Sequence, residues 1–135
     1  MLSTLFPFAV EYSYMYGAEY GFPVVGTHEH NLPCAVCLAS TCETVLMIPA
    51  KTTCPTSWTR EYYGYLMSER PIAGGNYVHH CSTFECVDKG IEYIPGSHTN
   101  INGALFYHVE AYCNGMQCPP YDPQKELNCV VHLLN

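Results

Sequence analysis

Aromatic rings stand beside charged side chains in residues 58–67, the stretch that contains the only tryptophan of the chain. Arg60, Glu61, Tyr62 and Tyr63 together offer flat apolar surface, fixed charge and hydrogen-bonding groups. Sugars are bound by this combination, because their C–H faces stack on aromatic rings while their hydroxyl groups need hydrogen-bond partners. A half-buried structural strand has the same composition. The stretch therefore predicts a candidate carbohydrate site and leaves a purely structural role open.

Two further groups of polar residues could bind a ligand. His28, His30 and Asn31 fall within one short turn-rich segment, and His108 and Glu110 share one side of another predicted strand. Histidine pairs also bind metal ions, but a zinc site needs further ligands and the sequence names none. The histidine segment thus predicts either sugar contacts or hydrogen-bonded loop histidines. A metal-dependent hydrolase that uses His28 and His30 is the third alternative.

No motif in the chain points to catalysis. There is no G-x-S-x-G nucleophile motif and no phosphate-binding glycine-rich loop. Glu61, Glu85, Asp88 and Glu110 could supply a carboxylate pair for glycoside hydrolysis, but no spacing selects one pair. We therefore expect a binding protein without enzymatic activity, cofactor or bound metal.

Charge and composition narrow the class of protein. The chain has 135 residues, the size of one domain, and its 48% hydrophobic residues are typical of a folded protein. The formal net charge of −7 weighs against nucleic-acid partners and against anionic membrane surfaces. No stretch approaches the roughly 18 apolar residues of a membrane-spanning helix, so we expect no membrane insertion. The apolar start lacks a basic region and is interrupted by Pro7, which is not typical of a signal peptide.

Nine cysteines indicate a disulfide-containing, secreted protein. Cys34 and Cys37 form a CxxC pair, but no second CxxC completes a zinc site. Disulfides are therefore expected, and because the possible pairings number on the order of a hundred, the sequence leaves the pairing open. An odd count leaves at least one cysteine free or joined to another chain. Cys81 lies in a predicted surface loop, a natural place for an interchain bridge.

Short strands are the elements that would position these groups. Residues 58–67 alternate with a period of two, which predicts one face with Trp58, Arg60, Tyr62, Gly64 and Leu66 and a second face with the residues between them. Further strands are expected near residues 12–16, 34–40, 43–49, 82–88, 104–113 and 127–133. No segment has helical periodicity with caps. The predicted fold is mostly β, a single compact disulfide-rich domain spanning residues 1–135, with about six to eight short strands and long loops. Residues 1–13 would be an N-terminal extension and residues 68–81 an irregular loop.

A set of motifs follows one order along the chain, at residues 16–20, 28–37, 45–50, 58–67, 84–88, 103–113 and 118–121. In this order they resemble secreted invertebrate proteins that are often labelled short-chain-collagen-like. Among these, the sequence is most similar to the small disulfide-linked N-acetylhexosamine-binding lectins of bivalves. The resemblance covers about residues 14–131. It is specific for the family and less specific for function.

The resemblance implies a lectin that recognises GlcNAc or GalNAc without calcium. Such a protein would be secreted, would form a homo- or hetero-dimer linked by disulfide, and would agglutinate particles in innate defence, since paired sites give avidity. The chemistry of the side chains selects the candidate sugar contacts His28, His30, Asn31, Arg60, Glu61, Tyr62, Tyr63, His108 and Glu110. A cross-linked extracellular-matrix or shell-matrix module without a sugar site remains the alternative.

The cysteines depart from the family pattern at three positions. Members generally end in L-x-C-V-V-C, whereas this chain has His132 at the last position, so one usual disulfide partner is missing. Cys42 and Cys81 stand where the family pattern has no cysteine, and the resemblance makes them the candidates for an interchain bridge. The remaining cysteines are expected to form disulfides within the chain: Cys34, Cys37, Cys54, Cys86, Cys113, Cys118 and Cys129.

Overall fold

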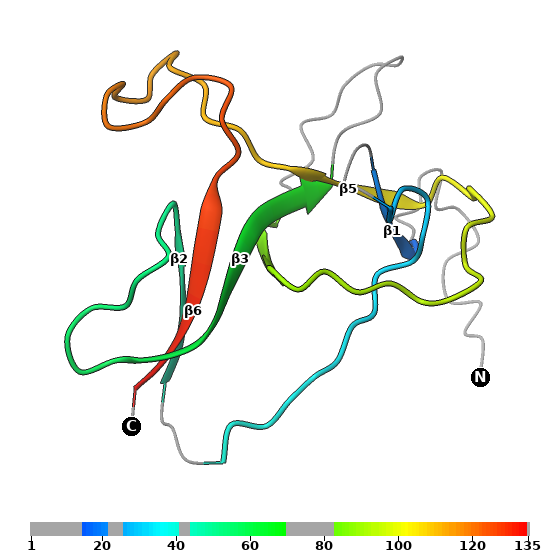
Figure 1. Cartoon of the computed structure of the whole chain (residues 1–135), viewed down its shortest axis with the longest axis horizontal. Coiled ribbons are helices and arrows are strands. Elements are labelled where there is room, and N and C mark those ends of the chain that lie inside the picture. The colour runs from blue at the N-terminus through cyan, green and yellow to red at the C-terminus, as the bar shows by residue number, and fades with distance from the viewer. Residues whose placement is uncertain (1–14, 22–25, 41–43, 70–82, 135) are drawn as a thin grey trace, which may run out of the picture.

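The computed structural model describes residues 15–21, 26–40, 44–69 and 83–134, and their regular structure is entirely β (Figure 1). The strands are β1 (Ala18–Tyr20), β2 (Thr44–Pro49), β3 (Thr59–Glu69), β4 (Glu85–Asp88), β5 (Ala104–His108) and β6 (Asn128–Leu134). They form one six-stranded sheet, and long loops join them. The prediction of a mostly-β, disulfide-containing domain is confirmed. These residues contain no helix that is long and apolar enough to cross a membrane.

β3 is the strand around which the sheet is built. Its first part pairs antiparallel with β6, and its last residues pair antiparallel with β5. Leu66 marks the change of partner, because it donates its N–H to the Leu127 carbonyl and accepts the Val109 N–H, both over 2.9 Å. The other edge of β3 pairs with β4. The aromatic and apolar residues of β3 suit a central strand, and its second half contains buried residues, among them Leu66 and Met67.

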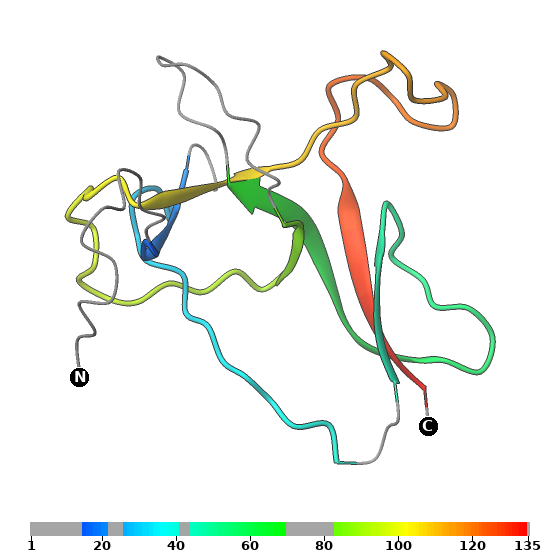
Figure 2. The ribbon, with the colours of Figure 1, turned by 180° about the vertical axis from the view of Figure 1, so that it is seen from behind.

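The outer strands extend the sheet in two directions. β2 pairs antiparallel with β6 along its whole length, and β1 pairs parallel with β5. The β1 end depends on a close approach between backbones: a Cβ atom at Gly103 would lie 2.3 Å from the Gly17 carbonyl oxygen. Figure 2 shows the resulting arrangement from behind, with β2, β6 and β3 side by side and with β5 and β1 continuing away from them.

A β-bulge interrupts the alternation of β3. Arg60 pairs with His132 and Tyr62 pairs with Val131, which are consecutive residues of β6. Because cross-strand partners share a face of the sheet, Arg60 and Tyr62 lie on opposite faces, and Glu61 is the extra residue between them. The predicted face containing both Arg60 and Tyr62 is therefore wrong. The strand itself is where the sequence placed it.

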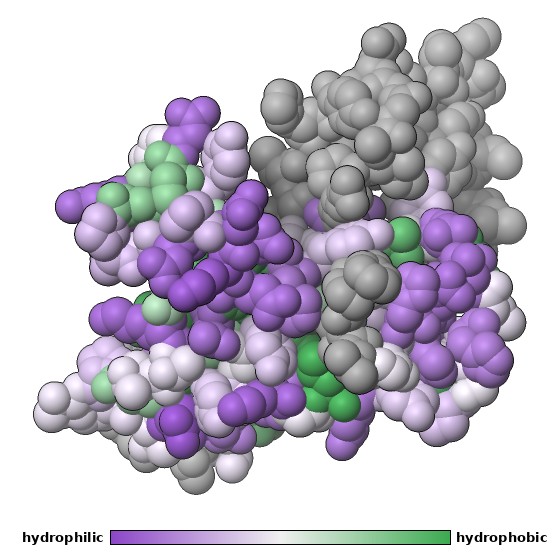
Figure 3. Space-filling view, turned by 45° about the horizontal axis from the view of Figure 1, so that its top comes forward, coloured by the Kyte–Doolittle hydropathy of each residue, from purple (hydrophilic) through white to green (hydrophobic). Residues whose placement is uncertain are grey.

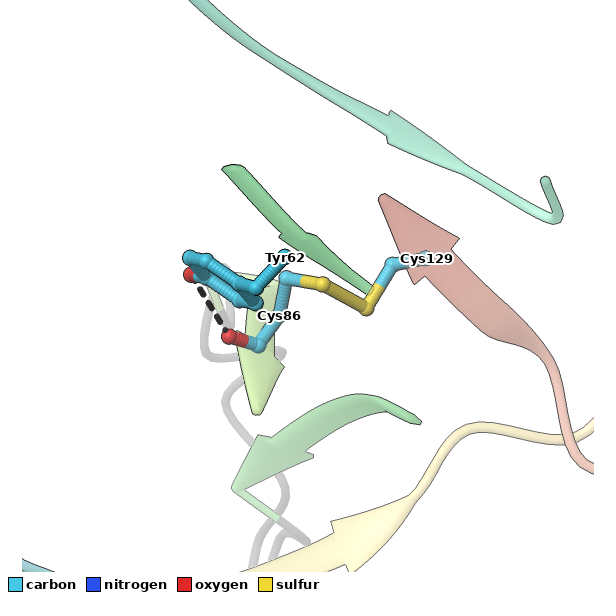
Figure 4. The surroundings of a disulfide bond; sticks show 3 residues. All are labelled: Tyr62, Cys86 and Cys129. Carbon is cyan, nitrogen blue, oxygen red and sulfur yellow. Dashed lines mark hydrogen bonds between the residues drawn. A yellow bond between two sulfur atoms is a disulfide. The ribbon is translucent and has the colours of Figure 1, made fainter. Parts of the chain in front are cut away.

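A disulfide joins the strands on the two edges of β3. Cys86 of β4 is bonded to Cys129 of β6, with Cα atoms 5.7 Å apart. In a flat sheet, strands on opposite edges of a third strand are about 9.5 Å apart, so the sheet curls tightly here. Gly64 permits this, because a Cβ atom there would lie 1.8 Å from the Val87 carbonyl oxygen. Figure 4 shows Tyr62 beside the bridge, and its hydroxyl donates to the Cys86 carbonyl over 3.0 Å.

The described core is small and lies mainly along β3 and β6, with one residue each from β1 and from the loop after β5. Its buried apolar residues are Tyr20, Leu66, Met67, Ala111, Cys129, Val130 and Val131. The view in Figure 3 shows mostly hydrophilic side chains, with apolar ones in small separate patches. A core of this size gains from covalent closure. The Cys86–Cys129 bridge spans 43 residues and the Cys113–Cys118 bridge spans 5. Loop-closure entropy assigns them about 4 and about 2 kcal/mol of stabilisation.

Several predicted boundaries differ from the structure. Residues 34–40 form no strand, because they lie in an extended segment with no β partner. β5 ends at His108, five residues before the predicted end, where the chain turns toward the Cys113–Cys118 bridge. β3 includes Ser68 and Glu69, which the sequence had assigned to the irregular loop. Most of that loop and the predicted N-terminal extension lie outside the described residues.

Candidate functional site

Two loops meet beside β1 and bring together a set of rings and polar groups. Residues 26–31 turn back against β1, and residues 92–98 lie against that turn, as both Figure 1 and Figure 2 show. We call the side chains gathered there the loop cluster: His28, His30, Asn31, Tyr93 and His98. The first three were predicted as sugar contacts.

Main-chain hydrogen bonds fix the turn of residues 26–31 on β1. Tyr20 donates its N–H to the His30 carbonyl over 2.9 Å, and its carbonyl accepts the Glu29 N–H over 3.0 Å. Glu29 adopts a φ of 65°, which reverses the chain between the two histidines. The side chain of Tyr20 is buried and donates its hydroxyl to the Glu92 carbonyl over 2.9 Å. Burial, followed by the nearby Cys34 and Glu92, raises the pKa of Tyr20, so the hydroxyl keeps the proton that it donates.

The second loop contains a β-turn at residues 94–97 that is hydrogen-bonded to Asn31. Pro95 and Gly96 occupy its centre, Gly96 has a φ of 78°, and Ser97 donates its N–H to the Ile94 carbonyl. The Ser97 hydroxyl then accepts the Asn31 N–H over 2.9 Å, while the Asn31 carbonyl accepts the Ile94 N–H over 3.1 Å. Both bonds are made by the main chain of Asn31, so they fix the place of this residue between the two loops.

Three rings pack together in the loop cluster. The His30 ring lies 4.4 Å from the Tyr93 ring and 5.4 Å from the His98 ring, measured between centroids. His30 is half-buried and contacts both rings, whereas Tyr93 is 44% exposed and His98 is also exposed. His28 stands at the edge, with its Nδ1 atom 3.7 Å from a Glu29 carboxylate oxygen. Exposed ring faces therefore lie beside imidazole, amide and carboxylate groups.

A second polar surface, which we call the β3 face, runs along the middle of the sheet. It contains Arg60, Tyr63, Tyr65, Lys89 and His108. The Tyr65 and His108 rings meet edge to face, with centroids 5.0 Å apart. The Arg60 guanidinium lies 4.9 Å from the centroid of Tyr63 and the Lys89 ammonium lies 5.3 Å from it. Two cations thus already occupy the surroundings of this ring, so it is a poorer stacking surface for a sugar than Tyr93.

The other predicted sugar contacts are not brought into either group. Tyr62 lies on the opposite side of the sheet against Cys86. Glu61 is exposed at the bulge, and Glu110 pairs with Glu126 in an isolated β-bridge. Burial, followed by Glu85 and Asp88, raises the pKa of Tyr62. This keeps the Tyr62 hydroxyl protonated and hydrogen-bonded, which is a structural role.

The cysteines divide into bridged, free and undescribed ones. Cys86, Cys113, Cys118 and Cys129 form the two disulfides described above, as predicted. Cys34, Cys37 and Cys54 are free, which differs from the prediction that they are bridged. Cys34 and Cys37 are exposed in the segment without a β partner, and the Cys54 sulfur contacts the imidazole of His132. Cys42 and Cys81 lie outside the described residues.

Metal ligands are not gathered in the described ranges. Within residues 15–21, 26–40, 44–69 and 83–134, no group of three or more His, Cys, Asp or Glu side chains is arranged to hold a metal ion. The Nδ1 atom of His30 is hydrogen-bonded to the His28 carbonyl over 3.1 Å, and the Nδ1 atom of His28 lies 3.7 Å from a Glu29 carboxylate oxygen. Both ring nitrogens therefore interact within the turn of residues 26–31.

No protein-family model, curated protein or solved structure matches the chain. The case for a function therefore depends on the motifs of the sequence and on the geometry of the loop cluster.

Tyr93 and His98 are the two members of the loop cluster that the sequence analysis missed. A signal was present, because both flank the Pro95–Gly96 turn, and loops placed by a rigid sheet commonly carry binding residues. The sequence could not show that this turn meets the turn of residues 26–31. The hydrogen bond that joins them, between Asn31 and Ser97, links residues 66 positions apart.

Proposed function

We propose that the protein is a lectin that binds N-acetylated hexosamines, GlcNAc or GalNAc, at the loop cluster. The observation that supports this most is the packing of His30 against both Tyr93 and His98, at centroid distances of 4.4 and 5.4 Å, on loops anchored to β1. Exposed rings on a fixed scaffold offer stacking surface that loses little entropy when a sugar binds. The polar side chains around them offer hydrogen bonds to its hydroxyl groups.

An acetamide group fits this mixture of surfaces. Its methyl group needs apolar contact, which the exposed face of Tyr93 offers. Its N–H and carbonyl need an acceptor and a donor, and Glu29, Asn31 and the imidazoles of His28 and His98 are of these types. A site that hydrogen-bonds the acetamide would reject a sugar lacking it, because the site's polar groups would be left unpaired.

Secretion and covalent dimers belong to the same proposal. The Cys86–Cys129 and Cys113–Cys118 disulfides are compatible with an oxidising, extracellular compartment. A dimer joined by further cysteines would present two weak sugar sites to one particle, and so would agglutinate cells in innate defence.

The test is retention on an immobilised GlcNAc column, followed by elution with GlcNAc, GalNAc, galactose and EDTA in turn. Elution by the two N-acetylated sugars alone supports the proposal. Elution by EDTA would instead assign the histidines to a metal site. Passage of the protein through every sugar column would contradict the proposal and favour the matrix module.

Matched variants locate the site. Tyr93→Ala should weaken retention by up to about tenfold, because a lost stacking ring costs up to about 1.5 kcal/mol. Tyr112 is 73% exposed and lies outside both polar surfaces, so Tyr112→Ala should leave retention unchanged. Sugar binding that survives Tyr93→Ala but is lost in Tyr63→Ala would move the site to the β3 face.

A further inference from the structure

A free thiol in contact with a buried imidazole lies at the β2–β3 end of the sheet. Cys54 is half-buried in the loop between β2 and β3, and its Sγ atom is hydrogen-bonded to Nδ1 of His132. His132 lies within β6, where it pairs with Leu46 of β2 and with Arg60 of β3, and it is 0% exposed. Loop and strand are 78 residues apart in the chain, so this contact is made by the fold.

The loop that carries Cys54 is held at several points. Ala50 donates its N–H to the Asn128 carbonyl over 2.7 Å, and Trp58 donates its N–H to the Pro55 carbonyl over 3.3 Å. The Arg60 guanidinium donates to the Thr52 carbonyl over 3.2 Å. These bonds hold the loop against β6 and β3, so the sulfur is kept beside the imidazole.

The imidazole has no other hydrogen-bond partner among the described residues. Its Nε2 atom is buried and unpartnered, and the Trp58 ring stands edge-on to it with centroids 6.2 Å apart. A buried ring nitrogen without a partner is uncommon in folded proteins, and a redox or catalytic role is one of its recognised explanations. No carboxylate bonds to Nε2 in this part of the chain, so His132 meets the thiol alone.

The contact suits proton transfer. Sγ and Nδ1 are in direct hydrogen-bonding contact. An imidazole at this distance can take the thiol proton as the sulfur attacks, which is how histidine activates cysteine nucleophiles.

We propose that Cys54 is a reactive thiol that exchanges with small-molecule disulfides, with His132 as its general base. His132 Nδ1 takes the thiol proton while Sγ attacks one sulfur of the small disulfide. A new S–S bond forms on Cys54, the original S–S bond breaks, and the leaving thiolate receives the proton from the imidazolium. Cys54 is oxidised and one half of the small disulfide is reduced to a thiol, so the small disulfide is the only oxidant needed.

The other free cysteines provide an internal comparison. Cys34 and Cys37 are exposed, whereas Cys54 is only half-exposed. If access alone decided the rate, Cys54 would react more slowly than either. A half-buried sulfur is also reachable by a small disulfide more readily than by a second protein. The proposal therefore predicts that Cys54, although less exposed, reacts faster than Cys34 and Cys37.

The experiment incubates the full chain with excess oxidised glutathione and stops the reaction with acid at intervals. The remaining thiol at each cysteine is then alkylated after unfolding and quantified by peptide mapping. Cys54 should lose its thiol at least about tenfold faster than Cys34 and Cys37, because general-base assistance is commonly worth more than this. In urea the three rates should converge. A native Cys54 rate at or below that of the exposed pair overturns the proposal, as does a lead that persists in urea.

Two variants separate the roles of the pair. His132→Gln keeps a polar side chain but cannot act as a base, so Cys54 should lose its lead over Cys34 and Cys37. His108→Gln, at another half-buried histidine on the β3 face, should keep that lead. Retention of the lead in a folded His132→Gln protein would overturn the role of His132. If this variant fails to fold, the comparison of native and urea-unfolded natural sequence still decides the proposal.

Discussion

Single residues in this protein decide which face of the sheet a group occupies and whether it serves structure or binding. Tyr62 is the clearest case. Its neighbours in the sequence made it a candidate sugar contact, yet the bulge at Glu61 places it on the opposite face from Arg60. There its hydroxyl is bonded to the Cys86 carbonyl, beside the disulfide. The role of a tyrosine thus depended on one inserted residue upstream.

The raised pKa of Tyr62 predicts a loss of stability at alkaline pH. Its unfolded-state pKa is near 10.0, and burial followed by Glu85 and Asp88 raises the folded-state pKa. The folded state therefore holds the proton more tightly. Its contribution to stability is complete below pH 10.0 and is lost as the pH rises through the higher folded-state pKa. Tyr62→Phe should make this alkaline decline shallower, and should cost about 1 kcal/mol at neutral pH for the lost hydrogen bond.

Urea unfolding followed by the fluorescence of Trp58, repeated across a pH series, measures both effects. Tyr112→Phe is the control, since Tyr112 is 73% exposed and should leave the alkaline decline as it is. An identical decline in Tyr62→Phe and in the natural sequence would show that Tyr62 is not its source.

At the scale of the elements, the sequence predicted the existence of strands better than their partners. The alternation of residues 58–67 located β3 to within two residues at its C-terminal end. The bulge could not be predicted, because an extra residue in one strand is defined only against the register of the other strand. The parallel pairing of β1 with β5 could not be predicted either. It joins Ala18 to Ala104, which are about 86 positions apart in the chain.

The candidate site was predicted in part for the same reason. His28, His30 and Asn31 were selected because they are polar and close in sequence, and they do share one cluster. Tyr93 and His98 joined them only through the fold. The pairing of Cys86 with Cys129 was equally beyond the sequence, because cysteine spacing does not define connectivity in a small disulfide-rich domain.

Gly64 of β3 pairs with both β4 and β6, and the close approach of β4 requires that this residue have no side chain. A Cβ atom there would lie 1.8 Å from the Val87 carbonyl oxygen and 2.7 Å from the Lys89 nitrogen, both backbone atoms of the β4 region. Gly64→Ala should therefore push β4 away from β3 and oppose the Cys86–Cys129 bridge. We expect a loss of at least about 3 kcal/mol, at the upper end of overpacking costs.

Thermal unfolding and the yield of the Cys86–Cys129 peptide after proteolysis would measure this loss. Gly17→Ala is the matched control, because nothing lies within 4 Å of the Cβ atom it would add. An equal change in melting temperature for the two variants would argue against a special role for Gly64.

At the scale of the whole molecule, the proposed covalent dimer needs cysteines other than those of the two disulfides and the free thiols. Cys34 and Cys37 are free and exposed in residues 34–40, which have no β partner (Figure 1). Val36 and Leu38 in the same segment are 106% and 92% exposed. A second copy could cover these two apolar side chains while the Cys34 and Cys37 thiols stay free. Cys42 and Cys81, the interchain candidates of the sequence analysis, lie outside the described residues.

Agglutination should need the covalent dimer, whereas sugar binding should not. On a non-reducing gel we expect a band at about twice the 15.1 kDa of the chain, which reductant converts to the single-chain band. Serine substitution of the bridging cysteines, identified by mapping the non-reduced peptides, should abolish agglutination because each molecule would carry one site. Each single site should still bind GlcNAc, so retention on the column should fall only because the avidity of paired sites is lost. That avidity raises the apparent affinity about a hundredfold or more.

A natural protein that migrates as a single chain without reductant would exclude covalent dimers. Agglutination that persists in the serine variants would require a non-covalent dimer, for which Val36→Ser and Leu38→Ser would be the next substitutions to make.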